Sequence, residues 1–212
     1  MTTVIVDYES GNLHSAEKAF QRMAREVGAG EVIVTSEPDT IRRASRVVLP
    51  GDGAFPACRK ELFDHRGVFE AMEEAVIKGG QPFLGICIGM QMMATRGLEY
   101  TPTPGFDWIG GEVVRIEPAD PTLPVPHMGW NDLLIDHPHP VFDGVESGQH
   151  CYFVHSYHFK VADDAQRLAH VDYAGDITAI VGRDNLLGMQ FHPEKSQKTG
   201  LHLIANFLRW QP

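Results

Sequence analysis

The chain has 212 residues, of which 43% are hydrophobic and 22% charged, so it holds enough apolar material for a globular core. It carries 18 lysines and arginines against 28 aspartates and glutamates, which gives a formal net charge of −10. This acidity opposes binding to nucleic-acid phosphates and to anionic membrane surfaces. We therefore expect neither nucleic acid nor membrane as a partner.

The sequence indicates a cytoplasmic protein. No apolar run approaches the roughly 18 residues that a membrane span needs. Residues 1–7 have no basic region before their short apolar run, so they do not resemble a signal peptide. The three cysteines, Cys58, Cys87 and Cys151, form no C-x-x-C pair. Such a sparse set argues against a disulfide scaffold or a zinc knuckle and favours a reducing compartment.

The first half of the chain alternates short apolar runs with helical periodicity. Apolar runs lie at 4–6, 32–34, 47–49 and 83–86. Helical patterns lie at 13–27, where Asn12 is the expected N-cap, and at 39–44, 57–64, 68–78 and 89–95. Short apolar strands separated by helices are typical of a parallel sheet covered on both faces. This predicts an open, doubly wound, mostly parallel α/β sheet of the flavodoxin-like type, with ligands outside the carboxyl ends of the strands.

The pattern changes after about residue 101. Segments 110–116, 131–135, 151–161, 168–173 and 178–181 look like strands joined by turns, which predicts an antiparallel, strand-rich second half. A further apolar run at 187–191 and a closing helix around residues 201–208 follow. Since no linker or repeat separates the halves, we expect residues 1–212 to form a single domain.

Cys87 follows a predicted strand within Gly85-Ile86-Cys87-Ile88-Gly89, which fits the G-x-C-x-G pattern of a nucleophile elbow. Small residues two positions before and after the cysteine leave room for a sharp strand-to-helix turn. A helix starting there directs N–H groups at the sulfur and favours the thiolate, and the Ile88 N–H can donate to an oxyanion. Taken alone, the motif is equally consistent with a buried structural cysteine.

His192-Pro193-Glu194 follows the last apolar run and completes a candidate triad. Pro193 holds the chain extended, so His192 and Glu194 face the same way. Glu194 would then accept a hydrogen bond from one ring nitrogen of His192 while the other faces Cys87. The loop Pro50-Gly51-Asp52-Gly53 ends another predicted parallel strand, and its backbone would supply a second oxyanion donor.

These segments together resemble the class I glutamine amidotransferases, whose glutaminase domain uses such a triad. A fuller set of blocks is similar to one branch of that family, the glutaminase subunits of imidazole glycerol phosphate synthases in histidine biosynthesis. In chain order the blocks are Asp7-Tyr8 to Asn12-Leu13, Pro50-Gly51-Asp52-Gly53-Ala54-Phe55, Gly85-Ile86-Cys87-Ile88-Gly89-Met90-Gln91, His127-Met128-Gly129-Trp130-Asn131, Tyr152-Phe153-Val154-His155-Ser156-Tyr157 and Gln190-Phe191-His192-Pro193-Glu194-Lys195-Ser196.

The resemblance implies the roles of the site residues. Cys87 would attack the carboxamide of glutamine, His192 would act as general acid and base, and Glu194 would orient His192. The oxyanion would be held by backbone N–H groups of Ile88 and of the loop residues Gly51, Asp52 and Gly53. Positions matching the family's glutamine contacts are Gly53, Gln91, Glu99, Ser156 and Tyr157.

The resemblance also implies a partner and no cofactor. Ammonia would pass to a separate (β/α)8-barrel cyclase subunit that makes imidazole glycerol phosphate and AICAR. Positions matching the partner-facing residues are Asn12, Trp130, Tyr152 and Lys195. Asp52 stands where the family usually has valine. Because a carboxylate aimed at the oxyanion would oppose catalysis, we expect the Asp52 side chain to point away from the sulfur.

Two other functions stay open at this point. The chain could serve a different synthase, for anthranilate, pyridoxal phosphate or a nucleotide, or it could be a catalytically silent flavodoxin-like binding module. A metal site is not expected, because the segment Asp136-His137-Pro138-His139-Pro140 reads as a surface turn. Cys58 and Cys151 lack the elbow and are expected to be core thiols. His127, His155 and His158 are expected to form structural hydrogen bonds.

Overall fold

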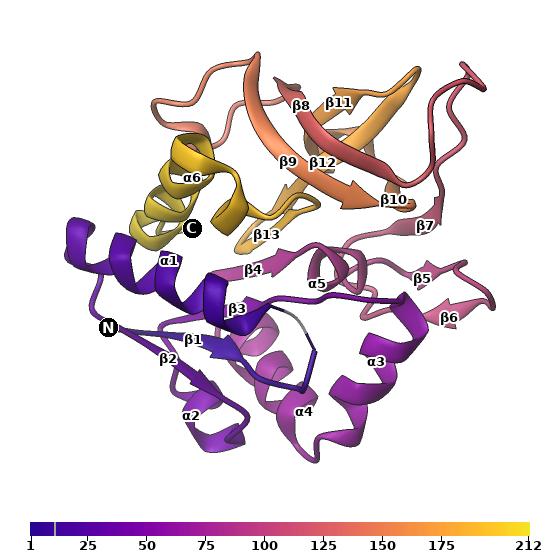
Figure 1. Cartoon of the computed structure of the whole chain (residues 1–212). Helices are drawn as coiled ribbons and strands as arrows, with labels where there is room; N and C mark the ends of the chain where they lie inside the picture. The colour runs from indigo at the N-terminus through magenta and orange to yellow at the C-terminus, as the bar shows by residue number, and fades with distance from the viewer. Residues whose placement is uncertain (11) are drawn as a thin grey trace.

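The computed structural model describes residues 1–10 and 12–212 (Figure 1). Within these residues the main sheet has nine strands. They are β1 (Thr2–Val6), β2 (Glu31–Thr35), β3 (Arg46–Leu49), β4 (Phe83–Ile86), β8 (His127–Ile135), β9 (Gln149–His155), β11 (Arg167–Asp172), β12 (Asp176–Arg183) and β13 (Leu186–Met189). Their order across the sheet is β2-β1-β3-β4-β13-β12-β11-β8-β9.

The sheet has a parallel half and an antiparallel half. Each strand from β2 to β13 runs parallel to its neighbours in that order. From β13 onward, β12, β11, β8 and β9 each run antiparallel to the strand before. The central strands β3, β4 and β13 are buried along their whole length, as expected for strands covered on both faces. The predicted fold class is confirmed in both halves.

Helices cover both faces of the parallel strands (Figure 1). Helices α1 (Leu13–Val27) and α6 (Gln197–Arg209) pack against each other on one face. On the other face lie α2 (Pro38–Arg42), α3 (Phe55–Asp64) and α4 (Val68–Glu73). The cap of α1 is the one expected from the sequence, because the Asn12 side chain accepts the N–H of Ser15 at 3.4 Å.

Two helices differ from the sequence prediction. The helical pattern at 68–78 divides into α4 and a π-helical turn, η1 (Glu74–Lys78). The helix expected at 89–95 is only the single turn α5 (Ile88–Gln91). Beyond Gln91 the α-helical bonds end, because the N–H groups of Met93 and Ala94 bond three residues back and that of Thr95 donates to the Gly111 carbonyl oxygen at 3.0 Å. The helix dipole behind Cys87 is therefore smaller than a full helix would give.

The second half contains a smaller sheet with the order β10-β7-β5-β6. Its strands are β5 (Arg96–Gly97), β6 (Thr103–Pro104), β7 (Gly111–Arg115) and β10 (Tyr157–Val161). The strand predicted at 151–161 breaks at Ser156, because β9 pairs with β8 in the main sheet whereas β10 pairs with β7 in the smaller one. The described residues also form three short 3₁₀ turns: η2 (Pro140–Phe142), η3 (Asp164–Gln166) and η4 (Pro193–Lys195).

One continuous hydrophobic cluster joins the two halves. It includes buried residues as far apart in the chain as Phe20, Phe83, Phe153 and Phe207. On this ground we infer that residues 1–212 form one domain, since separate domains would each enclose their own core. Within the described residues, no helix combines the length and the apolar character that crossing a membrane requires.

Candidate active site

Cys87 lies where β4 turns into α5, and its backbone is strained. Its φ of 55° and ψ of −114° are uncommon for a residue with a side chain. Two glycines make this turn possible. A Cβ on Gly85 would lie 2.5 Å from the Gly89 carbonyl oxygen, and a Cβ on Gly89 would lie 1.9 Å from that of Leu49. The G-x-C-x-G spacing is therefore a steric requirement of the elbow.

His192 and Glu194 lie beside this elbow because β13 is the parallel neighbour of β4. His192 Nδ1 is 2.9 Å from Glu194 Oε1, and the two side chains are 5% and 2% exposed. Burial acts to lower the pKa of His192, but hydrogen bonds to Cys87 and Glu194 and the charges of those groups raise this pKa to about 10. A protonated imidazole beside the sulfur is suited to donate a proton to a group bound at Cys87.

A cavity of about 230 Å³ opens over Cys87. Its lining contains all five positions that match glutamine contacts in the family, namely Gly53, Gln91, Glu99, Ser156 and Tyr157. Of the expected oxyanion residues, Ile88, Asp52 and Gly53 line the cavity. Gly51 is buried against Ile88, since a Cβ on Gly51 would lie 2.9 Å from the Ile88 Cβ. The break between β9 and β10 is what turns Ser156 and Tyr157 into this cavity.

The loop at residues 50–53 is held in place by hydrogen bonds from three side chains to its backbone carbonyl oxygens. Tyr8 Oη donates to the carbonyl oxygen of Pro50 at 2.7 Å. The Asp52 carbonyl oxygen accepts from Ser10 Oγ at 3.0 Å and from Cys58 Sγ at 3.4 Å. Because C=O and N–H point in opposite directions across a trans peptide, the N–H of Gly53 faces away from these two donors. Asp52 itself is exposed at the rim of the cavity, and the direction of its carboxylate remains a prediction.

Two side chains offer hydrogen-bond acceptors at the cavity. Glu99 is buried, and its Oε2 accepts the N–H of Phe55 at 2.8 Å. Gln91 Nε2 donates to the carbonyl oxygen of Tyr157 at 3.1 Å. Its Oε1 is buried and has no hydrogen-bond partner among the described residues. Since a buried acceptor without a partner is costly, Gln91 Oε1 is suited to a donor on a bound ligand.

The geometry is compatible with a cysteine nucleophile and a histidine base, and comparisons with known proteins show the family. The family model for class-I glutamine amidotransferases matches residues 4–210. The chain belongs to that family. It is 72% identical to the imidazole glycerol phosphate synthase subunit HisH of Cereibacter sphaeroides, over the whole of both chains. Proteins of the same name from Ruegeria pomeroyi and Rhodospirillum rubrum are 66% and 55% identical, again over both whole chains.

Solved structures show the same fold at low identity. A crystal structure of a glutamine amidotransferase matches with a TM-score of 0.71 at 18% identity, covering 98% of this chain and 99% of the other. A putative GMP synthase protein from Thermoplasma acidophilum matches with a TM-score of 0.69 at 19% identity, covering 99% of this chain and 92% of the other. The fold of the class I glutamine amidotransferases is thus present along the chain.

Two buried histidines of this amidotransferase connect the β8–β9 ribbon to the cavity. Asn131 Nδ2 lies 3.0 Å from the Asp172 carbonyl oxygen and 3.2 Å from His127 Nε2. His127 Nδ1 lies 3.1 Å from His155 Nε2, and His155 Nδ1 lies 2.9 Å from the Tyr157 carbonyl oxygen. Burial lowers the pKa of His127 to about 4 and that of His155 to about 3. Both are therefore neutral at pH 7, and they form the structural hydrogen bonds expected from the sequence.

The positions matched to partner contacts lie on adjoining elements of the amidotransferase. Trp130 on β8 is paired in register with Tyr152 on β9, and their ring centroids are 5.7 Å apart. Turn η4, which carries Lys195, contacts both β9 and α1, and Asn12 caps α1. Trp130 is 48% exposed, although its indole is large and apolar. Such an exposed aromatic side chain is typical of a protein-binding surface.

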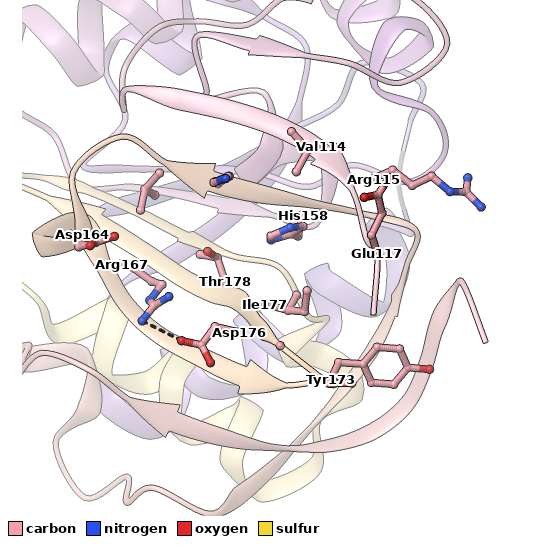
Figure 2. A pocket seen from close by; sticks show the side chains of 14 residues that line it. Val114, Arg115, Glu117, His158, Asp164, Arg167, Tyr173, Asp176, Ile177 and Thr178 are labelled. Atoms are coloured by element: carbon pink, nitrogen blue, oxygen red, sulfur yellow. Dashed lines mark ion pairs between the residues drawn. The ribbon is translucent and has the colours of Figure 1, made fainter. Parts of the chain in front are cut away.

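A second cavity of about 380 Å³ lies between the smaller sheet and the β11–β12 hairpin, and contains none of the expected catalytic residues (Figure 2). Its charged lining is balanced, since it includes three basic residues and three acidic ones, namely Arg115, Lys160 and Arg167 with Glu117, Asp164 and Asp176. Arg167 pairs with Asp176 at 3.4 Å, the dashed line in Figure 2. In the part of the chain that the structure describes, no cluster of three or more His, Cys, Asp or Glu side chains could hold a metal ion.

Proposed function

We propose that this chain is the glutaminase subunit of an imidazole glycerol phosphate synthase and acts in histidine biosynthesis. It hydrolyses glutamine to glutamate and ammonia. The observation that carries this proposal is the buried arrangement of Cys87, His192 and Glu194 beneath a cavity lined by the expected glutamine-contacting positions. The relatives that are 50–72% identical over the whole chain share one name, which identifies the synthase.

The residues of the site account for each step of the hydrolysis. The Cys87 thiolate attacks the carboxamide carbon, and the negative charge moves to the carboxamide oxygen, where the N–H groups of Ile88 and the 50–53 loop stabilise it. His192 donates its proton to the nitrogen, the C–N bond breaks, and ammonia leaves. The γ-glutamyl thioester remains on Cys87. His192 then takes a proton from water, whose oxygen attacks the thioester and releases glutamate and the thiolate.

The acceptors at the cavity suit the amino-acid end of glutamine. An α-ammonium group has three donors and no acceptor, and it is best held by carboxylate and amide oxygens. Glu99 and the unpartnered Oε1 of Gln91 supply both kinds of oxygen within the lining. We therefore assign these two residues to the α-ammonium group, with the carboxamide directed at Cys87.

Ammonia is delivered to a partner chain, which we propose to be a (β/α)8-barrel cyclase. The surface that would receive it contains Asn12, Trp130, Tyr152 and Lys195. Exposed aromatic residues in the centre of such a surface commonly supply most of the binding free energy. We also propose a cytoplasmic location, because all three cysteines are free thiols in the structure and glutaminase chemistry needs Cys87 reduced.

Labelling with a glutamine-mimicking electrophile tests this function against a catalytically silent binding module. We expect Cys87 to react at least about tenfold faster than Cys58 and Cys151, which are also buried and act as controls within the same molecule. Glutamine should protect Cys87 by competing for the cavity. Equal, slow labelling of all three cysteines would favour the silent module.

A further inference from the structure

Gln190 is a polar residue at the centre of the molecule, and the mechanism above gives it no role. It follows β13 directly and its side chain is inaccessible to solvent, with 0% exposure. The parallel register pairs Met189 with Ile86, so the next residues along the two strands are Gln190 and Cys87. Gln190 Nε2 lies 3.8 Å from Cys87 Sγ, which is within hydrogen-bonding distance for sulfur.

The orientation of the Gln190 amide is fixed by its neighbours. The Tyr157 carbonyl oxygen can only accept, so the Gln91 atom 3.1 Å away from it must be Nε2. The same Nε2 lies 2.9 Å from the other side-chain amide, which must therefore present Oε1 of Gln190. This leaves Nε2 of Gln190 as the atom that faces the sulfur. Turning the amide over would place two N–H donors against each other and an oxygen against Sγ.

We propose that Gln190 is a further catalytic residue of the proposed glutaminase, whose side-chain N–H donates to Cys87 Sγ and stabilises the thiolate. Gln91 holds the Gln190 amide in this orientation and is its positioning residue. A sulfur that accepts from Gln190 on one side and from protonated His192 on another is favoured as an anion, because both donors strengthen when the acceptor is charged. The bond weakens once the sulfur becomes a thioester, so Gln190 favours the free thiolate.

Other ionisable groups also act on the sulfur and must be held constant in any test. Those that contact Cys87, line its cavity or interact electrostatically with it are Tyr8, Asp52, Cys58, Glu99, His155, Tyr157, His192 and, through His192, Glu194. Gln190→Met leaves all of these groups in place and adds no ionisable group, because neither glutamine nor methionine ionises.

The test is the pH dependence of Cys87 alkylation by iodoacetamide in the full chain, read at each cysteine by peptide mass spectrometry. Alkylation forms an S–C bond, releases iodide and requires the thiolate. Loss of a hydrogen bond to a charged group should raise the midpoint for Cys87 in Gln190→Met by about one pH unit. Gln190→Glu, which places a carboxylate oxygen near the sulfur, should raise it further and provides a second variant if the first folds poorly.

Gln91→Met supplies the test of positioning. It should raise the midpoint less than Gln190→Met, and adding it to Gln190→Met should produce no further shift. Cys58 and Cys151 stay unlabelled while the fold is intact, so they report any loosening of the core. An unchanged Cys87 midpoint in folded Gln190→Met and Gln190→Glu would overturn the proposal. This assay needs neither glutamine nor a partner, so its result is independent of whether the chain proves to be a glutaminase.

Discussion

At the scale of single residues, the proposed chemistry depends on the few side chains that lie next to the Cys87 sulfur. The pairing of His192 with Glu194 could be predicted from their spacing of two positions, but the extended chain expected at Pro193 was wrong. Residues Pro193–Lys195 form the 3₁₀ turn η4, and this turn brings Glu194 Oε1 to 2.9 Å from His192 Nδ1. Gln190 could not be recognised in the same manner, because its side chain meets Cys87 only through the pairing of β13 with β4. One feature of the sequence did point to it: Gln190 is a glutamine inside the apolar run 187–191. A buried side-chain amide destabilises the fold unless it has a hydrogen-bond partner.

Glu194→Gln tests the role of the orienting carboxylate. The amide removes the negative charge that holds His192 protonated and in position, so we expect the pKa of His192 to fall from about 10. In the assembled complex, kcat for glutamate release should fall by about 100-fold or more. Glu31→Gln, at an exposed carboxylate on β2, is the matched control and should leave kcat unchanged. A kcat of Glu194→Gln within about threefold of the wild type would contradict this role.

At the scale of elements, the parallel strands and their helices could be predicted from apolar runs and periodicity. The break at Ser156 could not, because the alternation of apolar residues continues through it while the chain changes sheets. The shortness of α5 was also not predictable, since the N–H of Thr95, which a helix to residue 95 would use internally, donates to the distant Gly111 carbonyl oxygen. Both features shape the cavity, so the part of the site that depends on long-range pairing was predicted least well.

The elbow between β4 and α5 should tolerate no side chain at Gly89. A methyl group there would lie 1.9 Å from the carbonyl oxygen of Leu49, the last residue of β3. Relieving this clash would require a shift of the backbone, which costs free energy of folding. We expect Gly89→Ala to lower the free energy of unfolding by about 3 kcal/mol or more, measured by urea denaturation. Gly80→Ala is the control, because its Cβ meets nothing within 4 Å and only the positive φ costs free energy, about 1–2 kcal/mol. Equal losses in the two variants would show that this contact is unimportant.

The buried histidine pair between β8 and β9 should make the fold sensitive to acid. The pKa of His127 is about 4 and that of His155 about 3, against 6.5 in the unfolded chain. Between pH 6.5 and 4 the unfolded chain therefore binds more protons. The stabilisation is fully present above pH 6.5 and is lost as the pH falls, by about 1.4 kcal/mol per pH unit for each histidine.

This acid sensitivity can be measured by urea denaturation at pH 7 and pH 5. We expect His155→Gln to lose less of its free energy of unfolding between these two pH values than the wild type. His14→Gln, at an exposed position on α1, should lose as much as the wild type. If His155→Gln lost as much as the wild type, the neutral, buried state of this histidine would be contradicted.

At the scale of the whole molecule, both halves contribute to one core and one site. The proposed catalytic residues come from the parallel half, whereas Ser156, Tyr157 and the β8–β9 ribbon come from the antiparallel half. The composition was sufficient to expect a single globular unit. The pairing of exposed Trp130 with half-buried Tyr152 beside η4 required the structure, because it depends on the β8–β9 register.

Trp130→Ala tests the partner surface. Removal of a large, half-exposed side chain from the centre of an interface should weaken binding of the cyclase at least about tenfold, or 1.4 kcal/mol. Alkylation of Cys87 in the isolated chain should not change, because Trp130 does not line the cavity. Ile77→Ala removes an exposed apolar side chain from η1 and should bind the cyclase as the wild type does. Unaltered affinity of Trp130→Ala would place the interface elsewhere.

The most direct measurement is glutamate release from glutamine in three mixtures: the chain alone, with the cyclase subunit, and with that subunit plus its phosphorylated ribulotide ligand. We expect little release from the chain alone, strong release in the third mixture, and none from Cys87→Ala in any mixture. Release that the cyclase leaves unchanged would assign the glutaminase to a different partner. Release that persists in Cys87→Ala, or is absent from every wild-type mixture, would contradict the proposed triad chemistry.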